Sequence, residues 1–567
     1  MAGFWTGLSV IARRRLVAAL AAAAALTLFF ALAVPSLPCQ FPGGDSCPPP
    51  DDTEELVPAD ALAYIHVNLD PEQDQYVAAT EIAALVPNFT SQIAGRGLAG
   101  LPGPSGAAAD FENEVRPWLD DEAAIVVVGG IADTPEQVVL LEVEDPEGAS
   151  AFAAELAVGS VEPEDYQGTE LNVDDGGLAT ALLQGFLAIG STDGIRAVVD
   201  VAATAEDVTS LAEDAAASEL RDELPDNYLI DAYFSSEGVS ELIGGSTAIQ
   251  GSLAPFMAPG ASTGAAASLS AQDGELELAV RTRLDAEAAK AEPPFFAAFP
   301  PFEPQIPARL ASDALGYVGF GDPETTVQAL LGQASAQAPG VVSGFEDLAK
   351  DLREQGGVDL EDDLLAGLGR EAAFAVEPRT GAGAGAGEGE GDVVTTVGLP
   401  YLEFVADGVD EDQARRSLAA LQGPLAAAVD PGVGLQAPVF DEREIENVEV
   451  RSLRLSPAVE LAFAVFDGLA VVATDVQGIA RLAAGEAGGL DESELFRRAT
   501  EDFADEVSLQ AYFDLGGLVT TGENLGLAED PVYATFAAEF RSLDALALAV
   551  TESDSLLSSD ARLVFDG

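Results

Sequence analysis

Histidine, cysteine and lysine are almost missing from this chain of 567 residues. Its single histidine, His66, cannot build a metal site from several histidines, and we expect a partly exposed or core-edge side chain. The G-x-S-x-G segment at 260–264 matches a serine hydrolase turn that requires a later histidine. The G-x-G-x-x-G segment at 95–100 follows a predicted helix, whereas a dinucleotide site requires a preceding strand. We interpret both as chance matches and assign no catalytic, cofactor-binding or metal-binding residue.

Basic residues of both kinds are scarce. The chain has 25 Lys and Arg against 97 Asp and Glu, a formal net charge of −72. This charge excludes nucleic-acid binding through phosphate neutralisation and disfavours docking on an anionic membrane surface. It fits either a high-salt habitat or a secreted protein encoded by a GC-rich genome. The acidic clusters match no EF-hand pattern, so we interpret most of them as solvated faces.

The two cysteines, Cys39 and Cys47, lie close together near the N-terminus. In an oxidising compartment two such thiols are expected to close a short loop. Two thiols without neighbouring histidines make a poor metal site. The sequence therefore predicts a local disulfide between them.

Uninterrupted apolar sequence occurs at one place, residues 16–34, directly after three arginines. Nineteen residues of helix span about 28 Å, close to the thickness of a bilayer core. The arginines favour a cytoplasmic tail at 1–15 and an extracytoplasmic body after a Pro-rich stalk at 35–57. This arrangement predicts a single-pass protein of the cell membrane. Signal cleavage near Ala33, which would release a secreted protein, is the alternative.

An internal repeat organises the rest of the chain. Asp110-Phe111-Glu112 and Glu122-Ala123-Ala124 recur at 359–361 and 371–373, each 249 positions later (359 − 110 = 371 − 122 = 249). Order is kept at further matched positions, namely Tyr64 with Tyr317 and Tyr233 with Tyr512. The pattern predicts a tandem duplication, with copies at 58–287 and 308–567 joined by a Pro- and Phe-rich connector at 288–307. The connector phenylalanines are expected to pack where the two copies meet.

Each copy is predicted to be an α+β domain, an antiparallel sheet with helices packed on one face. Residues 63–69 alternate with period two, which places Ala63, Ile65 and Val67 inward and Tyr64 and His66 on the other face. Strands at 124–128 and 138–143 are near neighbours and should pair antiparallel. The Asp-Pro pairs at 70–71 and 322–323 are typical helix starts. A Gly-Ala-Glu segment at 381–391 is interpreted as a loop.

The sequence resembles a known family through the openings 58–64 and 312–317, together with Pro117-Trp118-Leu119 ahead of 122–124. These segments are similar to the domain of unknown function 3352. The second copy departs from this pattern at 366–369. The resemblance implies a secreted or membrane-anchored protein of high-GC Gram-positive bacteria, and it implies no activity, cofactor or site residue.

We therefore expect a non-enzymatic envelope protein that binds or scaffolds. Its partner would be another envelope protein or an apolar ligand, and the membrane would hold it through residues 16–34. A carrier of an apolar or lipid ligand is one alternative, and a hydrolase that uses paired carboxylates is another. Glu122 and Glu371, duplicated at the entry of a predicted strand, are interpreted as structural caps.

Overall fold

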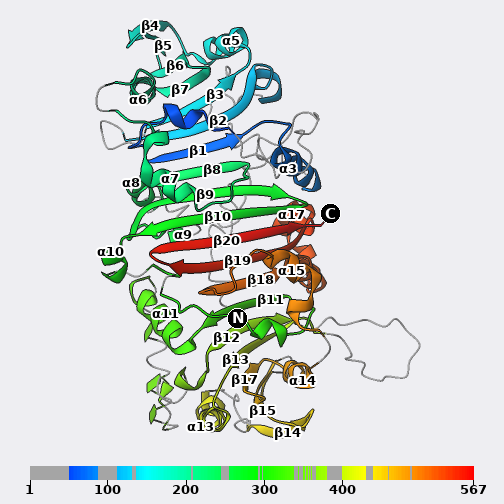
Figure 1. The fold of residues 1–567 in the computed structure, drawn as a ribbon. Helices are drawn as coiled ribbons and strands as arrows, with labels where there is room; N and C mark the ends of the chain where they lie inside the picture. The colour runs from blue at the N-terminus through cyan, green and yellow to red at the C-terminus, as the bar shows by residue number, and fades with distance from the viewer. Residues whose placement is uncertain are drawn as a thin grey trace, which may run out of the picture. The chain divides into compact units, whose positions relative to one another are not determined.

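The computed structural model describes residues 50–566, apart from 87–110, 130–135, 206–207, 244–253, 292–293, 297, 338–341, 344–348, 351–352, 355–356, 358, 361–364, 380–398, 429–438, 457–458 and 486–487. The chain divides into two compact units, and Figure 1 labels their helices and strands. Unit 1 comprises Met1–Pro294 with Ser553–Asp560 and Phe565–Gly567, and unit 2 comprises Phe295–Glu552 with Ala561–Val564.

Unit 1 is built on an antiparallel sheet of strand order β4-β5-β6-β7-β3-β2-β1-β8-β9-β10. The strands are β1 (Ala63–Asn68), β2 (Leu119–Val128), β3 (Glu136–Val143), β4 (Val161–Tyr166), β5 (Thr169–Asp174), β6 (Leu178–Leu183), β7 (Phe186–Ser191), β8 (Ile230–Ser235), β9 (Ser262–Gln272) and β10 (Glu275–Leu284). The predicted antiparallel pairing of 124–128 with 138–143 is confirmed.

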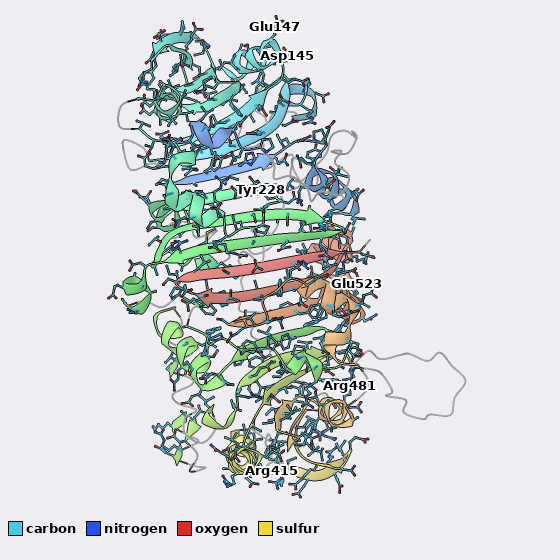
Figure 2. All side chains as sticks on the ribbon, in the orientation of Figure 1. Asp145, Glu147, Tyr228, Arg415, Arg481 and Glu523 are labelled. Carbon is cyan, nitrogen blue, oxygen red and sulfur yellow. The ribbon has the colours of Figure 1, made fainter. Side chains whose placement is uncertain are left out.

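Helices and short turns of helix join these strands. They are η1 (Thr53–Leu56), α3 (Asp74–Leu85), η3 (Phe111–Val115), α5 (Pro146–Leu156), α6 (Thr192–Ala202), η4 (Leu211–Glu213), α7 (Ala215–Arg221), α8 (Ser236–Gly238), η5 (Val239–Ile243), α9 (Ala254–Met257) and α10 (Ala286–Ala291). Several start at side-chain caps. Ser191 accepts from Gly194 N at the start of α6, and Asp145 accepts from Glu147 N at the start of α5 (Figure 2).

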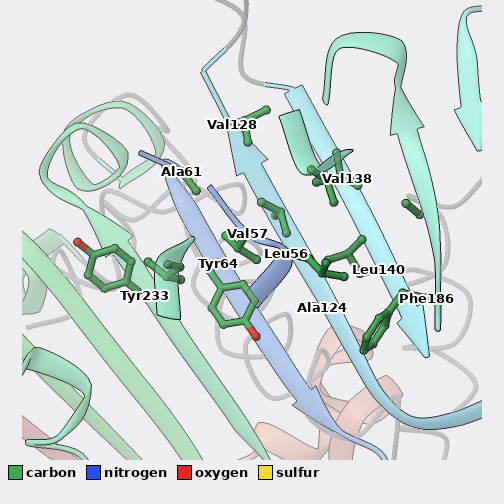
Figure 3. Close-up of a cluster of buried hydrophobic side chains, with 14 of the residues drawn as sticks. Leu56, Val57, Ala61, Tyr64, Ala124, Val128, Val138, Leu140, Phe186 and Tyr233 are labelled. Carbon is green, nitrogen blue, oxygen red and sulfur yellow. The ribbon is translucent and has the colours of Figure 1, made fainter. Parts of the chain in front are cut away.

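The main core of unit 1 lies between α6, η1 and one face of the sheet. Figure 3 shows Tyr64 on β1 within this cluster, together with Ala124 on β2. Ala63 and Val67 are buried as predicted, but Tyr64 and His66 are fully buried too, so the prediction of an outward face on this strand is wrong. The physical reason is that both faces of the strand are covered. In such a strand the alternation of residue types no longer separates buried positions from exposed ones.

Unit 2 is built on antiparallel strands in the order β14-β15-β16-β17-β13-β12-β11-β18-β19. The strands are β11 (Gly316–Gly321), β12 (Glu371–Glu377), β13 (Tyr401–Asp407), β14 (Asp441–Ile445), β15 (Val448–Ser456), β16 (Val459–Phe466), β17 (Leu469–Ala473), β18 (Leu509–Asp514) and β19 (Leu543–Ser553). The residues of β20 (Leu556–Phe565) are divided between the two units. Its helices are η6 (Ile306–Ala308), α11 (Pro323–Gln337), η9 (Leu365–Gly367), α13 (Glu411–Ala428), α14 (Val476–Ala484), η10 (Leu490–Glu492), α15 (Glu494–Thr500), α16 (Leu515–Asn524), η11 (Leu527–Glu529) and α17 (Pro531–Arg541).

Helices cover both faces of the unit 2 sheet. Ala373 belongs to the core that α14 closes with Ile479, whereas its neighbour Ala372 belongs to a second core that α13 closes with Leu418. Successive residues of a strand point to opposite faces, so α13 and α14 pack on opposite sides. The α+β class is confirmed, and the expectation of helices on one face is wrong for this unit.

Several sequence predictions fall outside the described residues. They concern the membrane-spanning run at 16–34, the disulfide between Cys39 and Cys47, and the loop at 381–391. Within the described part of the chain, no helix combines the length and apolar character needed to cross a membrane. The connector begins inside α10 and continues into unit 2, where Phe296, Phe299 and Phe302 are buried.

Candidate functional site

A cluster of ionisable side chains lies on one face of the unit 1 sheet, around the middle strand β1. His66 stands opposite Asp231 on β8, and Asn68 stands opposite Glu122 on β2. Directly paired residues share a face, so His66, Asp231 and Glu122 point to the same side. Asp51, just before η1, reaches the same place. We call Asp51, His66 and Glu122 the His66 cluster, because one ligand atom from each lies within 4.8 Å of the others.

Arg221, the last residue of α7, neutralises the acids beside this cluster. It pairs with Asp51 at 2.7 Å, with Asp231 and with Glu54. Burial would lower the pKa of Arg221, but the three carboxylates outweigh burial and raise it. Burial also raises the pKa of Asp231 to about 6, against the opposing effect of Arg221. The guanidinium therefore holds together α7, β8 and the segment before β1.

Asp51 accepts hydrogen bonds from several sides. Its Oδ1 accepts from Thr53 Oγ1 at 3.0 Å, from Glu54 N at 3.2 Å and from the Tyr64 hydroxyl. Burial alone would raise the pKa of Asp51, but nearby positive charge and these hydrogen bonds outweigh burial and lower it. Asp51 is therefore a carboxylate at neutral pH, and most of its hydrogen bonds come from its own turn and from Tyr64.

His66 is fully buried, so the expected exposed or core-edge position is wrong. Its ring stacks on Tyr64 with 6.5 Å between centroids and meets the edge of Tyr228 at 6.1 Å. Among the described residues, neither ring nitrogen has a hydrogen-bond partner. Burial lowers the pKa of His66, with Asp51 opposing this effect, so the imidazole is neutral at neutral pH. A buried polar group with no partner is costly and calls for an explanation.

Glu122 faces the imidazole across a short gap. Its Oε2 lies 3.9 Å from His66 Nε2, beyond hydrogen-bonding distance. Burial raises the pKa of Glu122 to about 8, although a hydrogen bond from Asp52 N opposes this. At neutral pH the pair is therefore a neutral imidazole beside a protonated carboxyl group.

The Glu122 side chain also caps a short helix. Asp52, the N-cap of η1, donates its backbone N–H to Glu122 Oε2 at 3.1 Å. In unit 2, Gln305 is the N-cap of η6 and donates to Glu371 Oε2 at 2.8 Å. Both glutamates thus orient the segment that enters the central strand, which agrees with a structural cap. The helices that these glutamates cap are η1, before β1, and η6, before β11. The sequence had suggested that each glutamate caps the helix that directly precedes it in the chain.

Unit 2 has the same framework without the histidine. Gly319 on β11 stands opposite Gln510 on β18, where unit 1 has His66 opposite Asp231. A Cβ on Gly319 would overlap the Tyr317 hydroxyl, so the tyrosine fills the space that an imidazole would need. The hydroxyl of Tyr317 lies 3.5 Å from Glu371 Oε1. Tyr64 and Tyr317 each pair with a tyrosine of the next strand, and Glu122 and Glu371 each face the last residue of the central strand. Among the described residues, the three-residue cluster occurs in unit 1.

Unit 2 buries a different acidic group beneath α14. Glu377 accepts from the Tyr401 hydroxyl at 2.8 Å and pairs with Arg481 at 3.2 Å (Figure 2 labels Arg481). Glu403 on β13 is almost fully buried, and neither carboxylate oxygen has a hydrogen-bond partner among the described residues. Burial, and then Glu377, raise the pKa of Glu403 well above its usual range. Gly478 permits this arrangement, because a Cβ there would overlap the Glu403 carboxylate.

Sequence reasoning named Glu122 and His66 separately and missed Asp51, Arg221 and Asp231. Arg221 lies 167 residues from Glu54, so no local motif connects them. One signal was available, since Asp231 directly precedes the repeated Ala232-Tyr233 segment. Tyr233 pairs with Tyr64 in unit 1, and Tyr512 pairs with Tyr317 in unit 2.

The His66 cluster offers one nitrogen and two carboxylates in a sealed place. Such a set can hold a divalent cation or share a proton. It is poorly suited to attack a large substrate, because the side chains of His66 and Glu122 are only 0% and 3% exposed. A general acid or base must reach the proton that it transfers.

The family model described as "Protein of unknown function (DUF3352)" matches residues 16–564 of the chain. "Structure of crystal form I of TP0453" is similar at 8% identity, covering 42% of this chain and 80% of that one, with TM-score 0.24. Crystal form IV of TP0453 is similar at 7% identity over 42% and 81% of the two chains, also with TM-score 0.24. Such low scores carry no argument about fold or function. No curated protein matches this chain.

Proposed function

We propose a function from the premise that the family match establishes: this chain belongs to the DUF3352 family of proteins of unknown function. We propose that it is a non-enzymatic binding protein of the cell envelope. Residues 16–34 hold it in the membrane, and the acidic body lies outside. The proposal rests on one observation in unit 2, an exposed aromatic patch on the sheet.

The patch centres on Phe374, which presents 57% of its surface to solvent in the middle of β12. Val318 and Phe404 flank it on β11 and β13, and both are only half-buried. The rings of Phe374 and Phe404 lie 5.2 Å apart. Exposed aromatic side chains at the centre of an apolar row are typical of protein-binding surfaces. We call these three residues the Phe374 patch.

The partner is a second envelope protein with an apolar surface rimmed by basic residues. An apolar face matches the Phe374 patch, and a basic rim complements the net charge of −72. The buried titratable groups of both units support binding over catalysis, because Glu122, Glu371 and Glu403 are at most 3% exposed. Catalysis by a paired-carboxylate hydrolase remains the alternative from another class.

A carrier of lipid is the remaining alternative. The unit 2 sheet and α13 enclose a cavity of about 20 Å³, lined by Gly367, Leu368, Phe404, Ala414, Ser417, Leu418, Ala470 and Val472. This volume accommodates about one water molecule and no lipid chain. Native mass spectrometry of the purified chain distinguishes a carrier, which retains an apolar ligand, from a binding protein.

The body is proposed to be a tandem duplication. Each central strand supports this, since β1 lies between β2 and β8 while β11 lies between β12 and β18. Matched registers support it further, with Tyr64 opposite Tyr233 and Tyr317 opposite Tyr512. A solved structure tests the proposal, because the two units must then superpose with Tyr64 over Tyr317.

The topology can be tested with alkaline phosphatase fused after residue 60 in a bacterial host. We expect an active fusion, because the reporter folds only outside the cytoplasm. An inactive fusion would refute export. A mature N-terminus near residue 34 would show that the apolar run is a cleaved signal and that the protein is secreted.

Binding can be tested by placing a photo-crosslinking residue at position 374 and, as a control, at position 182. Leu182 is also exposed, at 43%, but lies on the unit 1 strand β6. We expect a discrete crosslinked protein at 374 alone, and its loss with an added Phe404→Ser substitution. Equal crosslinking at both positions, or none at 374, would refute the Phe374 patch as the binding surface.

A further inference from the structure

The geometry points to a binding site for one divalent transition-metal ion in unit 1, held by an imidazole nitrogen of His66 and by carboxylate oxygens of Asp51 and Glu122. This site does not depend on the proposed binding function or on membrane anchoring. It rests on the geometry of three residues, on the unpartnered imidazole and on the local balance of charge.

The distances suit a small cation after slight closure. One ligand atom from each residue lies within 4.8 Å of the others, and His66 Nε2 is 3.9 Å from Glu122 Oε2. Ligands at 2.0–2.2 Å from a tetrahedral zinc ion are about 3.4 Å apart, so closure requires movements of about 1 Å. Asp51 can supply such a movement, because it lies in the turn before η1 and not in a strand.

The unpartnered imidazole is the second, independent observation. His66 is 0% exposed, and both ring nitrogens lack a hydrogen-bond partner within the described residues. A metal ion would satisfy one nitrogen, which a neutral imidazole offers as an acceptor. Asp51 Oδ2 accepts from Arg221 Nη2, which leaves a lone pair on that oxygen for the ion. The backbone N–H of Asp52 orients Glu122, as outer hydrogen bonds orient metal ligands.

Local charge also favours a cation. Asp51, Glu54, Glu122 and Asp231 are acidic, whereas Arg221 is the one permanent positive charge that pairs with this group in the described structure. If all four carboxyl groups ionised, three negative charges would remain uncompensated in a buried place. A divalent ion supplies two positive charges and allows Glu122 to bind as a carboxylate.

The donor set indicates the class of metal. One imidazole with two carboxylates suits zinc, manganese or iron(II), whereas calcium and magnesium prefer oxygen donors alone. Bound there, the ion would join three separate segments, namely the turn at Asp51, strand β1 and strand β2. Its effect would be to fix residues 50–56 on the sheet.

The test uses the full chain in detergent, with Cys39→Ser and Cys47→Ser so that thiols do not bind zinc. After chelator treatment, zinc binding is measured by equilibrium dialysis in excess calcium, which occupies exposed acidic clusters. We expect one zinc per chain. His66→Gln and Glu122→Gln should each weaken binding by more than about 100-fold, beyond the effect of losing an outer hydrogen bond. Glu371→Gln is the matched control, because Glu371 caps η6 as Glu122 caps η1.

A second readout keeps the test decisive if a variant folds poorly. Zinc should slow hydrogen exchange at residues 51–57 of the wild-type chain and leave the equivalent segment at 304–310 unchanged. Cobalt substitution should give visible absorption bands that His66→Gln removes. The proposal would be overturned by absence of stoichiometric zinc in the wild type, by equal affinity in His66→Gln, or by equal loss of affinity in Glu371→Gln.

Discussion

Replacing Glu122 by glutamine should stabilise unit 1 increasingly as the pH rises. The pKa of Glu122 is raised from 4.5 to about 8 by burial. A carboxyl group whose folded pKa is raised favours folding below its unfolded pKa of 4.5, and that contribution is lost as pH rises to about 8. The difference of about 3.5 pH units, at 1.36 kcal/mol each, sets a ceiling of about 5 kcal/mol.

The Glu122→Gln variant would keep the main local contact, because the amide oxygen of the new side chain can still accept from Asp52 N. The new NH₂ group could donate to the unpartnered His66 nitrogen that now faces Glu122. The variant should therefore match the wild type at pH 4.5 and exceed it by at least about 2 kcal/mol at pH 8.

The assay is urea unfolding in chelator, followed by the fluorescence of Trp118. This side chain is 3% exposed beside β2 and so reports on unit 1, and Trp5→Phe removes the other tryptophan. The quantity compared is the difference in unfolding free energy between Glu122→Gln and the wild type from pH 4.5 to 8.5. A difference that stays flat with pH would refute the burial of an ionisable Glu122. Glu147→Gln on α5, where the side chain is exposed, gives the baseline for removing one surface carboxylate in the same assay.

Three further outcomes follow from the buried charges. Arg221→Met should lower the free energy of unfolding in urea by about 3–5 kcal/mol, because the buried Asp231 loses its ion-pair partner. Arg196→Met, whose native side chain is 34% exposed, should lower it by less than about 1 kcal/mol. Equal losses in the two variants would contradict this reasoning. Glu403→Gln should raise the melting temperature more at pH 7.5 than at pH 4, because the raised pKa of Glu403 means that its ionisation destabilises the fold as pH rises; no gain at pH 7.5 would oppose it. The melting temperature of the wild type should rise from low ionic strength to about 1 M salt as repulsion within the −72 charge is screened, and a flat response would show that the charges are already balanced.

The sequence allowed the fold to be predicted where the chain carries local signals. The strands predicted at 124–128 and 138–143 lie within β2 and β3, and Asp322-Pro323 starts α11 at Pro323 as predicted. The similar pair at Asp70-Pro71 misled, because turns follow it and α3 starts at Asp74. The proline of such a pair fixes its own φ angle at a value that suits a helix start. It does not show how many residues the chain needs before the helix can pack on the sheet.

The candidate site was harder to predict because its parts are distant in sequence. His66 was conspicuous as the single histidine, yet its burial depends on Tyr228, Tyr64 and the segment before η1. Asp51 was assigned to a stalk because of its Pro- and Asp-rich neighbours, whereas the Arg221 ion pair brings it onto the sheet. The composition of residues 35–57 indicates a solvent-exposed segment on average. One buried ion pair is nevertheless enough to place Asp51 on the sheet.

The capping of η1 also determines how a pulling force would enter unit 1. Tension applied at residue 50 would reach the sheet first through side chains, the Arg221 guanidinium and the Glu122 carboxylate, before any strand is loaded. Strand β1 comes next, and its neighbours β2 and β8 are hydrogen-bonded along both edges. The side-chain contacts of Asp51 and Asp52 would therefore yield before β1, and the segment ahead of the sheet would lengthen by several residues.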